Sequence, residues 1–166
     1  MELYLIRHGI AVDRSEEIPE NERMLTPEGR QKMQKVAKRL DDLGVSFSLM
    51  VTSPLVRARQ TAEILLAQKL SSQLEESHHL APSGDILDWL TNWLEPRQFT
   101  NDTKIAIVGH EPNLSNWADM LVWGFVKGGI VLRKAGIIGL TLPETGSKIG
   151  HSQIFWLTSP KFFLKN

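Results

Sequence analysis

The chain has 166 residues, of which 42% are hydrophobic and 23% charged, an ordinary composition for one globular domain with a sizeable core. Lys plus Arg and Asp plus Glu number 19 each, so no overall charge favours nucleic acid or an anionic membrane as a partner. The absence of cysteine excludes disulfides, Cys-ligated zinc and a cysteine nucleophile. No basic leader or membrane-length apolar run is present, and we expect a single domain over residues 1–166 in a cytoplasmic protein.

The first predicted element is an apolar strand that begins at Glu2 and runs into the motif YLIRHG, residues 4–9. Short apolar runs are typical of buried parallel strands, and ligands bind beyond the carboxyl ends of such strands. Arg7 and His8 follow the strand at this point. They are candidates for a functional site, although a strand end that turns polar on meeting solvent explains their position equally well.

A polar segment, IAVDRSEEIPENERM, predicts a loop over residues 10–24. It leads into a predicted helix over residues 25–44, with Thr26 as the N-cap, Pro27 as the first helical residue and Gly44 at the C-terminal cap. An apolar stripe at helical spacing indicates that this helix packs on a sheet. The stripe consists of Met33, Val36, Ala37, Leu40 and Leu43.

The alternation of strand and helix then repeats. SLMVTSP at residues 48–54 predicts a second strand, and a helix follows it over residues 55–70. KIAIVGH at residues 104–110 predicts a third strand, and the helix after it covers residues 111–123, with Pro112 near its start. The apolar face of that helix consists of Leu114, Trp117, Ala118, Leu121 and Val122.

Between these units, residues 84–94 predict one more helix. Its expected apolar face consists of Ile86, Leu87, Leu90, Trp93 and Leu94. Residues 135–142 and 152–157 predict two late strands joined by a Gly-containing turn, which favours an antiparallel hairpin at the edge of the sheet. The whole pattern predicts an α/β fold, a three-layer α/β/α sandwich whose sheet is mostly parallel with an antiparallel edge strand.

Three predicted strands end in RHG, TSPLVRARQT and VGH. Because parallel strands with right-handed crossovers bring their carboxyl ends to one edge of the sheet, we expect Arg7, His8, Arg57 and His110 to converge. Two guanidinium groups suit a dianionic phosphoryl group, and the first turn of a helix, where Arg57 lies, favours an anion. Arg59 points to another face of that helix and is expected to be solvated.

Two histidines beside a phosphate have clear chemical uses. A neutral imidazole can attack phosphorus and form a phosphohistidine, and a second histidine can donate a hydrogen bond to the phosphoryl oxygens. Paired histidines also bind metals, but the sequence has neither the i, i+4 His pair of a metalloprotease helix nor an obvious ring of carboxylates. We therefore expect neither a metal nor another cofactor.

The segments LIRHG, SPLVRARQTA and VGHEP resemble the histidine phosphatase superfamily, the phosphoglycerate mutase-like or branch 1 family, and the resemblance covers most of the chain. The short length and the segment RMLTPEG look like the SixA type of protein-phosphohistidine phosphatase. The resemblance implies that His8 is the phosphorylated nucleophile and His110 the second pocket histidine. It implies further that Arg7 and Arg57 clamp the phosphate and that Arg23 is an additional phosphate or substrate contact.

Many members of this family place a Glu general acid after the second Arg-bearing helix, within a longer segment that covers the pocket. The corresponding stretch here is EESHHLAPSGDIL, in which Asp85 is the nearest acid candidate. Glu75 and Glu76 precede the loop. Asp85 is equally suited to be the N-cap of the following helix, so its role stays open.

We expect a metal-independent phosphatase that acts through phospho-His8, with phosphohistidine on a signalling protein, such as a histidine-containing phosphotransfer domain, as the favoured substrate. The lack of a long insertion implies an open pocket, which suits a phosphorylated side chain on another protein. The alternatives are a broad small-molecule phosphomonoesterase and a non-catalytic phosphate-binding module. Lys127, Arg133 and Lys134 form a basic loop that either rims the site or lies elsewhere on the surface.

Overall fold

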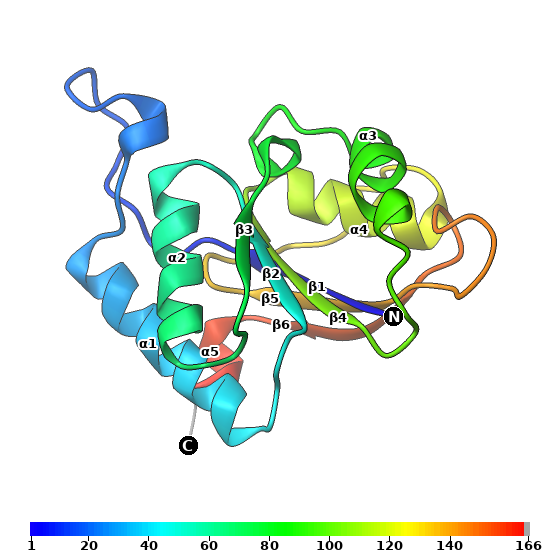
Figure 1. Ribbon diagram of the computed structural model, residues 1–166. Helices are drawn as coiled ribbons and strands as arrows, with labels where there is room; N and C mark the ends of the chain where they lie inside the picture. The colour runs from blue at the N-terminus through cyan, green and yellow to red at the C-terminus, as the bar shows by residue number, and fades with distance from the viewer. Residues whose placement is uncertain (165–166) are drawn as a thin grey trace.

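In the computed structural model, which describes residues 1–164, six strands form one sheet in the order β3-β2-β4-β1-β5-β6 (Figure 1). The strands are β1 (Glu2–Arg7), β2 (Leu49–Thr52), β3 (Leu74–Glu76), β4 (Lys104–Gly109), β5 (Ile137–Thr141) and β6 (Gln153–Thr158). Strands β1 to β4 are all parallel to one another, whereas β5 is antiparallel to both β1 and β6. The predicted hairpin of two late strands therefore closes one edge of a mostly parallel sheet.

Helices cover both faces of the sheet (Figure 1). One face carries α1 (Pro27–Asp42), α2 (Val56–Ala67) and α5 (Pro160–Phe163). The other carries α3 (Ile86–Asp88), its π-helical continuation Trp89–Leu94, the 3-10 turn Glu95–Arg97, and α4 (Asn113–Trp123). Two further 3-10 turns, Glu20–Glu22 and His78–Leu80, lie in the connections. The predicted three-layer α/β/α sandwich is confirmed.

The alternation of side chains along β1 shows how the sheet supplies two cores. Leu3 and Leu5 are fully buried on the face covered by α3 and α4. Tyr4 and Ile6 are buried on the opposite face, against α1 and α2. Successive side chains of a strand point to opposite faces, so a continuous apolar run is what a doubly covered strand needs. The strand is thereby held firmly, and its carboxyl end has a fixed position.

Helix α1 begins and ends close to the predicted residues. The Thr26 hydroxyl accepts a hydrogen bond from the Gly29 backbone N–H at 2.9 Å, which is the N-cap contact. Gly44 has a φ of +70°, the left-handed conformation that ends many helices. One part of the predicted stripe is wrong, because the Leu43 side chain is 51% exposed. Leu43 caps the helix, and the turn of the chain there carries its side chain off the packed face.

The helix predicted over residues 84–94 also differs in its buried face. Leu87 is 51% exposed, and Trp89 is fully buried in its place. The buried positions follow the spacing i, i+3, i+4, i+7 and i+8 from Ile86, from which Leu87 is displaced by about 100° around the axis. Strand β3, only three residues long with two glutamates, was not predicted, because an edge strand of that length has no apolar run to reveal it.

Candidate active site

The carboxyl ends of β1 and β4 lie side by side and bring two histidines together. Arg7 is paired with Gly109 in the parallel register of these strands, and the His8 backbone N–H donates to the Gly109 carbonyl at 3.1 Å. The side chains of His8 and His110 follow directly, with ring centroids 5.2 Å apart and planes inclined by 53°. Both side chains are buried. The sheet topology alone thus places the two imidazoles side by side.

The His8 ring is held in one tautomer. Its Nδ1 lies 2.7 Å from the backbone carbonyl oxygen of Gly9, which can only accept a hydrogen bond, so Nδ1 carries the proton. Burial, with smaller contributions from the charges of His110, Arg57 and Arg7, lowers the pKa of His8 to about 3. The ring is therefore neutral at pH 7, and Nε2 presents a lone pair. A neutral imidazole with a free Nε2 is the form that can attack phosphorus.

The residue after His8 is fixed by the neighbouring helix. The Gly9 N–H donates to the Thr61 hydroxyl at 3.0 Å, and that hydroxyl donates to the Arg57 carbonyl at 2.7 Å. A Cβ at Gly9 would lie 2.9 Å from Cγ of Met33, so only glycine fits without displacing the α1 side chain. Thr61 therefore connects the turn that orients His8 to the first turn of α2. Sequence reasoning missed this residue, although it stands four positions after Arg57 in the quoted motif.

His110 is buried and is hydrogen-bonded to Ser53 through Nε2 at 2.7 Å. Burial, followed by the charge of Arg57, lowers the pKa of His110 to about 4, so this ring is also neutral at pH 7. The Ser53 oxygen already accepts from the Leu55 N–H at 3.3 Å. If its hydroxyl hydrogen points to Nε2, the remaining proton of His110 lies on Nδ1. Ser53 was not singled out from the sequence, since a serine at a strand end has no distinguishing pattern.

Two of the predicted site residues carry buried polar atoms without a hydrogen-bond partner within residues 1–164. They are Nε of Arg7 and Nδ1 of His110. Most buried polar atoms in folded proteins are paired, so an unpaired one needs an explanation. The rest of the Arg7 guanidinium is anchored, because Nη1 donates to the Leu132 carbonyl at 2.8 Å. Arg7 Nε is always a donor, and His110 Nδ1 is a donor when the Ser53 hydroxyl donates to Nε2.

Glu20, in the connection that follows β1, holds the guanidinium groups of Arg57 and Arg23 together. Its Oε1 accepts from Arg57 Nη2 and from Arg23 Nη1, each at 2.9 Å. Arg57 also donates to the Glu20 carbonyl at 2.7 Å, and Arg23 to the Val12 carbonyl at 2.9 Å. The carboxylate shows that Arg57 and Arg23 are spaced to share one anion. Arg23, which the resemblance implies is a further phosphate or substrate contact, therefore lies beside Arg57.

Glu20 itself was not predicted. Desolvation opposes ionisation of this carboxyl, but the hydrogen bond from Arg23 and the charges of Arg57, Arg23 and Arg14 outweigh it and lower its pKa. The side chain is therefore ionised at pH 7. Several glutamates lie in the same loop, and nothing in their spacing distinguishes the one that meets the guanidinium groups.

Asp85 takes the position of a helix cap. It is exposed, and its Oδ1 accepts from the Asp88 N–H at 3.0 Å, which makes it the N-cap of α3. Among residues 1–164, no hydrogen bond or ion pair joins Asp85 to His8 or His110. The other carboxyls considered from the sequence form ion pairs away from the histidines, Glu75 with Arg97 at 2.8 Å and Glu76 with Arg59 at 3.9 Å.

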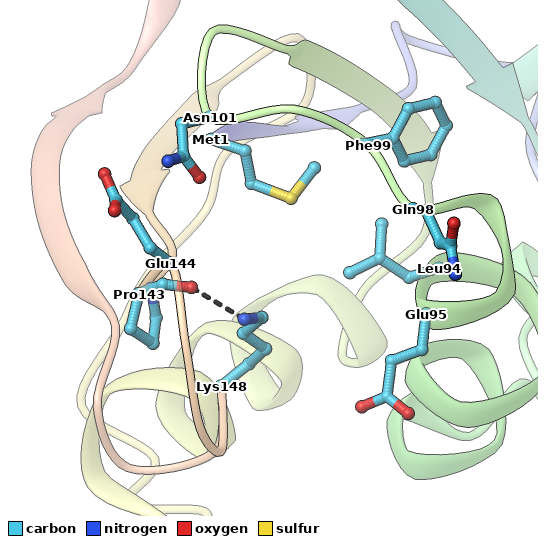
Figure 2. Close-up of a pocket in the computed structure, with 9 residues that line it drawn as sticks. All are labelled: Met1, Leu94, Glu95, Gln98, Phe99, Asn101, Pro143, Glu144 and Lys148. Carbon is cyan, nitrogen blue, oxygen red and sulfur yellow. Dashed lines mark hydrogen bonds between the residues drawn. The ribbon is translucent and has the colours of Figure 1, made fainter.

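Figure 2 shows a cavity at the amino ends of β1 and β4, opposite the histidines, and its volume is about 210 Å³. It lies beside Met1, which precedes β1, and Asn101, which precedes β4. None of the predicted site residues lines it. Within the part of the chain that the structure describes, no group of three or more His, Asp or Glu side chains could hold a metal ion. Over the same residues, no helix is long and apolar enough to cross a membrane.

The comparisons with known proteins point to one family. A sequence model of the histidine phosphatase superfamily (branch 1) matches residues 3–81. An uncharacterized protein of Picosynechococcus sp. is 42% identical over 165 residues, which cover 99% of both chains. The mitochondrial serine/threonine-protein phosphatase Pgam5 of Drosophila mojavensis is 29% identical over 94% of this chain, which spans only 57% of the Pgam5 sequence.

Solved structures agree with this assignment at the level of the fold. The structure of the protein histidine phosphatase SixA complexed with tungstate has a TM-score of 0.82 and 24% identity, with 98% of this chain and 99% of that chain covered. The match therefore includes the whole sheet and both helical layers. Together with the paired histidines at the ends of β1 and β4, these likenesses show that the chain belongs to the histidine phosphatase superfamily, branch 1, with a fold of the SixA type.

Proposed function

We propose that this protein is a cytoplasmic, metal-independent phosphatase that removes phosphate from phosphohistidine on a signalling protein. The observation that carries the proposal is the state of His8, a buried neutral imidazole with Nδ1 held by the Gly9 carbonyl and Nε2 free. The guanidinium groups of Arg7 and Arg57 act on the same ring by their charges. This is the arrangement that a nucleophile for phosphoryl transfer requires.

In the first step, His8 Nε2 attacks phosphorus in line with the bond to the leaving group. The Nε2–P bond forms as the P–N bond of the substrate breaks, and the departing imidazole keeps the electron pair and takes a proton from solvent. In the second step, water attacks the phosphorus of phospho-His8, the P–Nε2 bond breaks with its electrons returned to Nε2, and inorganic phosphate leaves. The proton released by the water goes to solvent.

The charge that builds on the phosphoryl oxygens is balanced by groups of the chain. Arg7 and Arg57 supply fixed positive charge, and Arg23 adds a third guanidinium beside Arg57. The unpaired Nδ1 of His110 is placed to donate to one of the oxygens. For the phosphate to take both terminal nitrogens of Arg57, the Glu20 carboxylate must leave Nη2 and the Glu20 carbonyl must leave Nη1.

The choice of phosphohistidine rests on the leaving group. An ester expels an alkoxide that needs an acid, whereas the imidazole of phosphohistidine can be protonated on its ring and leaves readily. Asp85, the nearest acid candidate, caps α3 and forms no hydrogen bond or ion pair with the histidines within residues 1–164. The fold shared with the protein histidine phosphatase SixA supports the same substrate. A histidine-containing phosphotransfer domain is the partner that we propose.

A second candidate is supported by the likeness to Pgam5, which is a serine/threonine-protein phosphatase. The test is a panel of phosphohistidine, phosphoserine and phosphothreonine peptides with one surrounding sequence, together with an aryl phosphate, all assayed in the presence of a chelator. We expect phosphate release in every chelated assay and the highest kcat/KM for phosphohistidine. A preference for phosphoserine or phosphothreonine would overturn the substrate assignment, and no release from any substrate would leave a phosphate-binding module.

A further inference from the structure

A groove of about 750 Å³ opens beside Arg7, and basic residues from several parts of the chain line it. Arg7 ends β1, Lys32 lies on α1, Arg133 and Lys134 lie in the loop before β5, and Lys161 lies on α5. We call these five side chains and the space between them the basic groove. Ile10 and Phe162 add apolar surface to it, and no acidic residue among residues 1–164 lines it.

The positive charge of the basic groove is balanced only in part among residues 1–164, by Asp13 near Lys134 and Glu111 near Arg7. Formal charges over the whole chain sum to zero, so this concentration of cations is local. No carboxylate of residues 1–164 lies within ion-pair distance of Lys32, Arg133, Lys134 or Lys161, while Lys38, on the same helix as Lys32, pairs with Asp42 at 3.2 Å. Clustered cations without counter-ions repel one another and attract an anionic partner.

The field of the basic groove is continuous with that of the phosphate site. Burial, followed by the charges of Arg7, Arg23 and Arg57, lowers the pKa of Lys134, against the opposing effect of Asp13. Arg7 belongs to both places, because it lines the groove and its backbone leads directly into His8. A phosphorylated side chain on His8 would therefore bring its flanking residues over the groove.

Resting on the proposed function, we propose that the basic groove binds an acidic segment next to the phosphorylated residue of the substrate protein. The complementary charge selects Asp- or Glu-rich sequence, and the exposed ring of Phe162, 73% accessible, offers an apolar contact at the edge. The groove is open along one side and has room for several side chains, which suits a segment of a larger molecule. The occupant is thus a protein surface with acidic groups beside its phosphorylated residue.

The experiment compares two phosphohistidine peptides that differ only in flanking residues, Glu in one and Gln in the other. The test variant carries Lys32→Gln, Arg133→Gln and Lys161→Gln, and its matched control carries Arg30→Gln, Lys35→Gln and Lys38→Gln, which remove the same charge from the exposed side of α1. We expect the wild type and the control to favour the Glu peptide about tenfold in kcat/KM, through KM, and the test variant to lose this preference.

An aryl phosphate serves as the internal reference, since it has no flanking segment to reach the groove, and all three proteins are expected to hydrolyse it at rates within about twofold of one another. Equal kcat/KM for the two peptides with the wild type, or an unchanged preference in the test variant, would overturn the proposed role of the groove. Fluorescence anisotropy with unphosphorylated Glu and Gln peptides needs no turnover, so binding confined to the Glu peptide would support the groove even if phosphohistidine hydrolysis failed. Tighter binding of a single-stranded oligonucleotide than of the Glu peptide would show that the partner class is wrong.

Discussion

The two ends of the parallel strands carry cavities of very different character. Beyond the carboxyl ends of β1 and β4 lie two buried neutral histidines and the basic groove. Before the amino ends lies the cavity of Figure 2, where Lys148 donates to the Pro143 carbonyl at 2.6 Å and Glu144 lies nearby. Charges of both signs line that cavity, and its lysine has a partner.

Buried polar atoms without partners, and not hollow space, separate these two ends of the strands, although Trp89 Nε1 and Asp119 Oδ1 on the helices are also unpaired within residues 1–164. Arg7 Nε and His110 Nδ1 are buried at the carboxyl end without partners in residues 1–164, and leaving such atoms unpaired costs about 1–3 kcal/mol each. No residue around the cavity of Figure 2 has an atom of that kind in the same range. A phosphate that paired these atoms would recover the lost free energy, which agrees with the proposed phosphate site at the carboxyl end.

The largest effect should come from His8→Ala. Because Nε2 of His8 forms the bond to phosphorus, we expect the variant to lose turnover and the acid-labile phosphoenzyme altogether. Rapid-quench labelling with a ³²P-labelled substrate measures both. Glu144→Gln, at the opposite end of the sheet, is the control and should keep wild-type labelling. Labelled phosphate on His8→Ala at the wild-type rate would place the nucleophile elsewhere.

Arg57→Lys should reduce kcat/KM by more than about tenfold, because a point charge does not reproduce two parallel hydrogen bonds from a planar fork. The guanidinium of Arg57 is buried and presently binds the Glu20 carbonyl and carboxylate through separate nitrogens. Arg59→Lys, an exposed change on the same helix, controls for the loss of an arginine from α2. An Arg57→Lys variant within twofold of wild type would show that the fork is not used.

The strand ends could be predicted from the sequence because the backbone alone determines where they go. YLIRHG and KIAIVGH are continuous apolar runs in parallel strands, so His8 and His110 had to emerge at one edge. The partners of these histidines could not be predicted in the same way. Thr61, Ser53 and Glu20 act through side chains whose neighbours come from distant segments, and a hydroxyl or a loop carboxylate has no periodicity that reveals its partner.

The pH dependence of stability should also separate the buried histidines from exposed ones. The folded-state pKa is about 3 for His8 and about 4 for His110, below the ordinary 6.5, so between pH 4 and 6.5 the unfolded chain binds protons that the folded chain does not. The free energy of unfolding therefore falls as pH decreases through this window, and is unaffected by these groups above it. At pH 5 each histidine should cost about 1–2 kcal/mol relative to pH 7.

Urea unfolding of His8→Gln at pH 7 and pH 5 measures the contribution of His8 to this pH dependence. The loss of stability on acidification should be smaller than in the wild type by about 1–2 kcal/mol, since glutamine does not titrate. His78→Gln changes an exposed side chain on the 3-10 turn His78–Leu80, and it should lose as much stability on acidification as the wild type. The same loss in wild type and His8→Gln would mean that His8 is accessible to protons in the folded state.

Glu20→Gln should improve phosphate binding at the carboxyl end. The dianion competes with the Glu20 carboxylate for Arg57 and Arg23, so removing this charge should lower the Ki of inorganic phosphate by about three- to tenfold with little change in kcat. Glu22→Gln, in the same 3-10 turn, removes equal charge and should leave Ki unchanged. Weaker inhibition of Glu20→Gln by phosphate would instead show that Glu20 orients the two arginines for the substrate.

The smallest effect concerns Asp85, and two substitutions separate its possible roles. Asparagine caps a helix about as well as aspartate but cannot supply a proton at neutral pH, whereas alanine removes both functions. Because Asp85 Oδ1 accepts from the Asp88 N–H at 3.0 Å, we expect Asp85→Ala to lower the free energy of unfolding by about 1 kcal/mol and Asp85→Asn to change it little.

Activity of these two variants distinguishes a cap from an acid. If Asp85 only caps α3, Asp85→Asn should keep nearly wild-type kcat/KM on both an alkyl phosphate and a phosphohistidine peptide. If it protonates the leaving group, the alkyl ester should lose far more than the phosphohistidine peptide, because an alkoxide needs the proton and an imidazole leaves readily. Since the carboxylate is exposed and engaged with the backbone of its own helix, we expect the first outcome, with both substrates measured in one buffer.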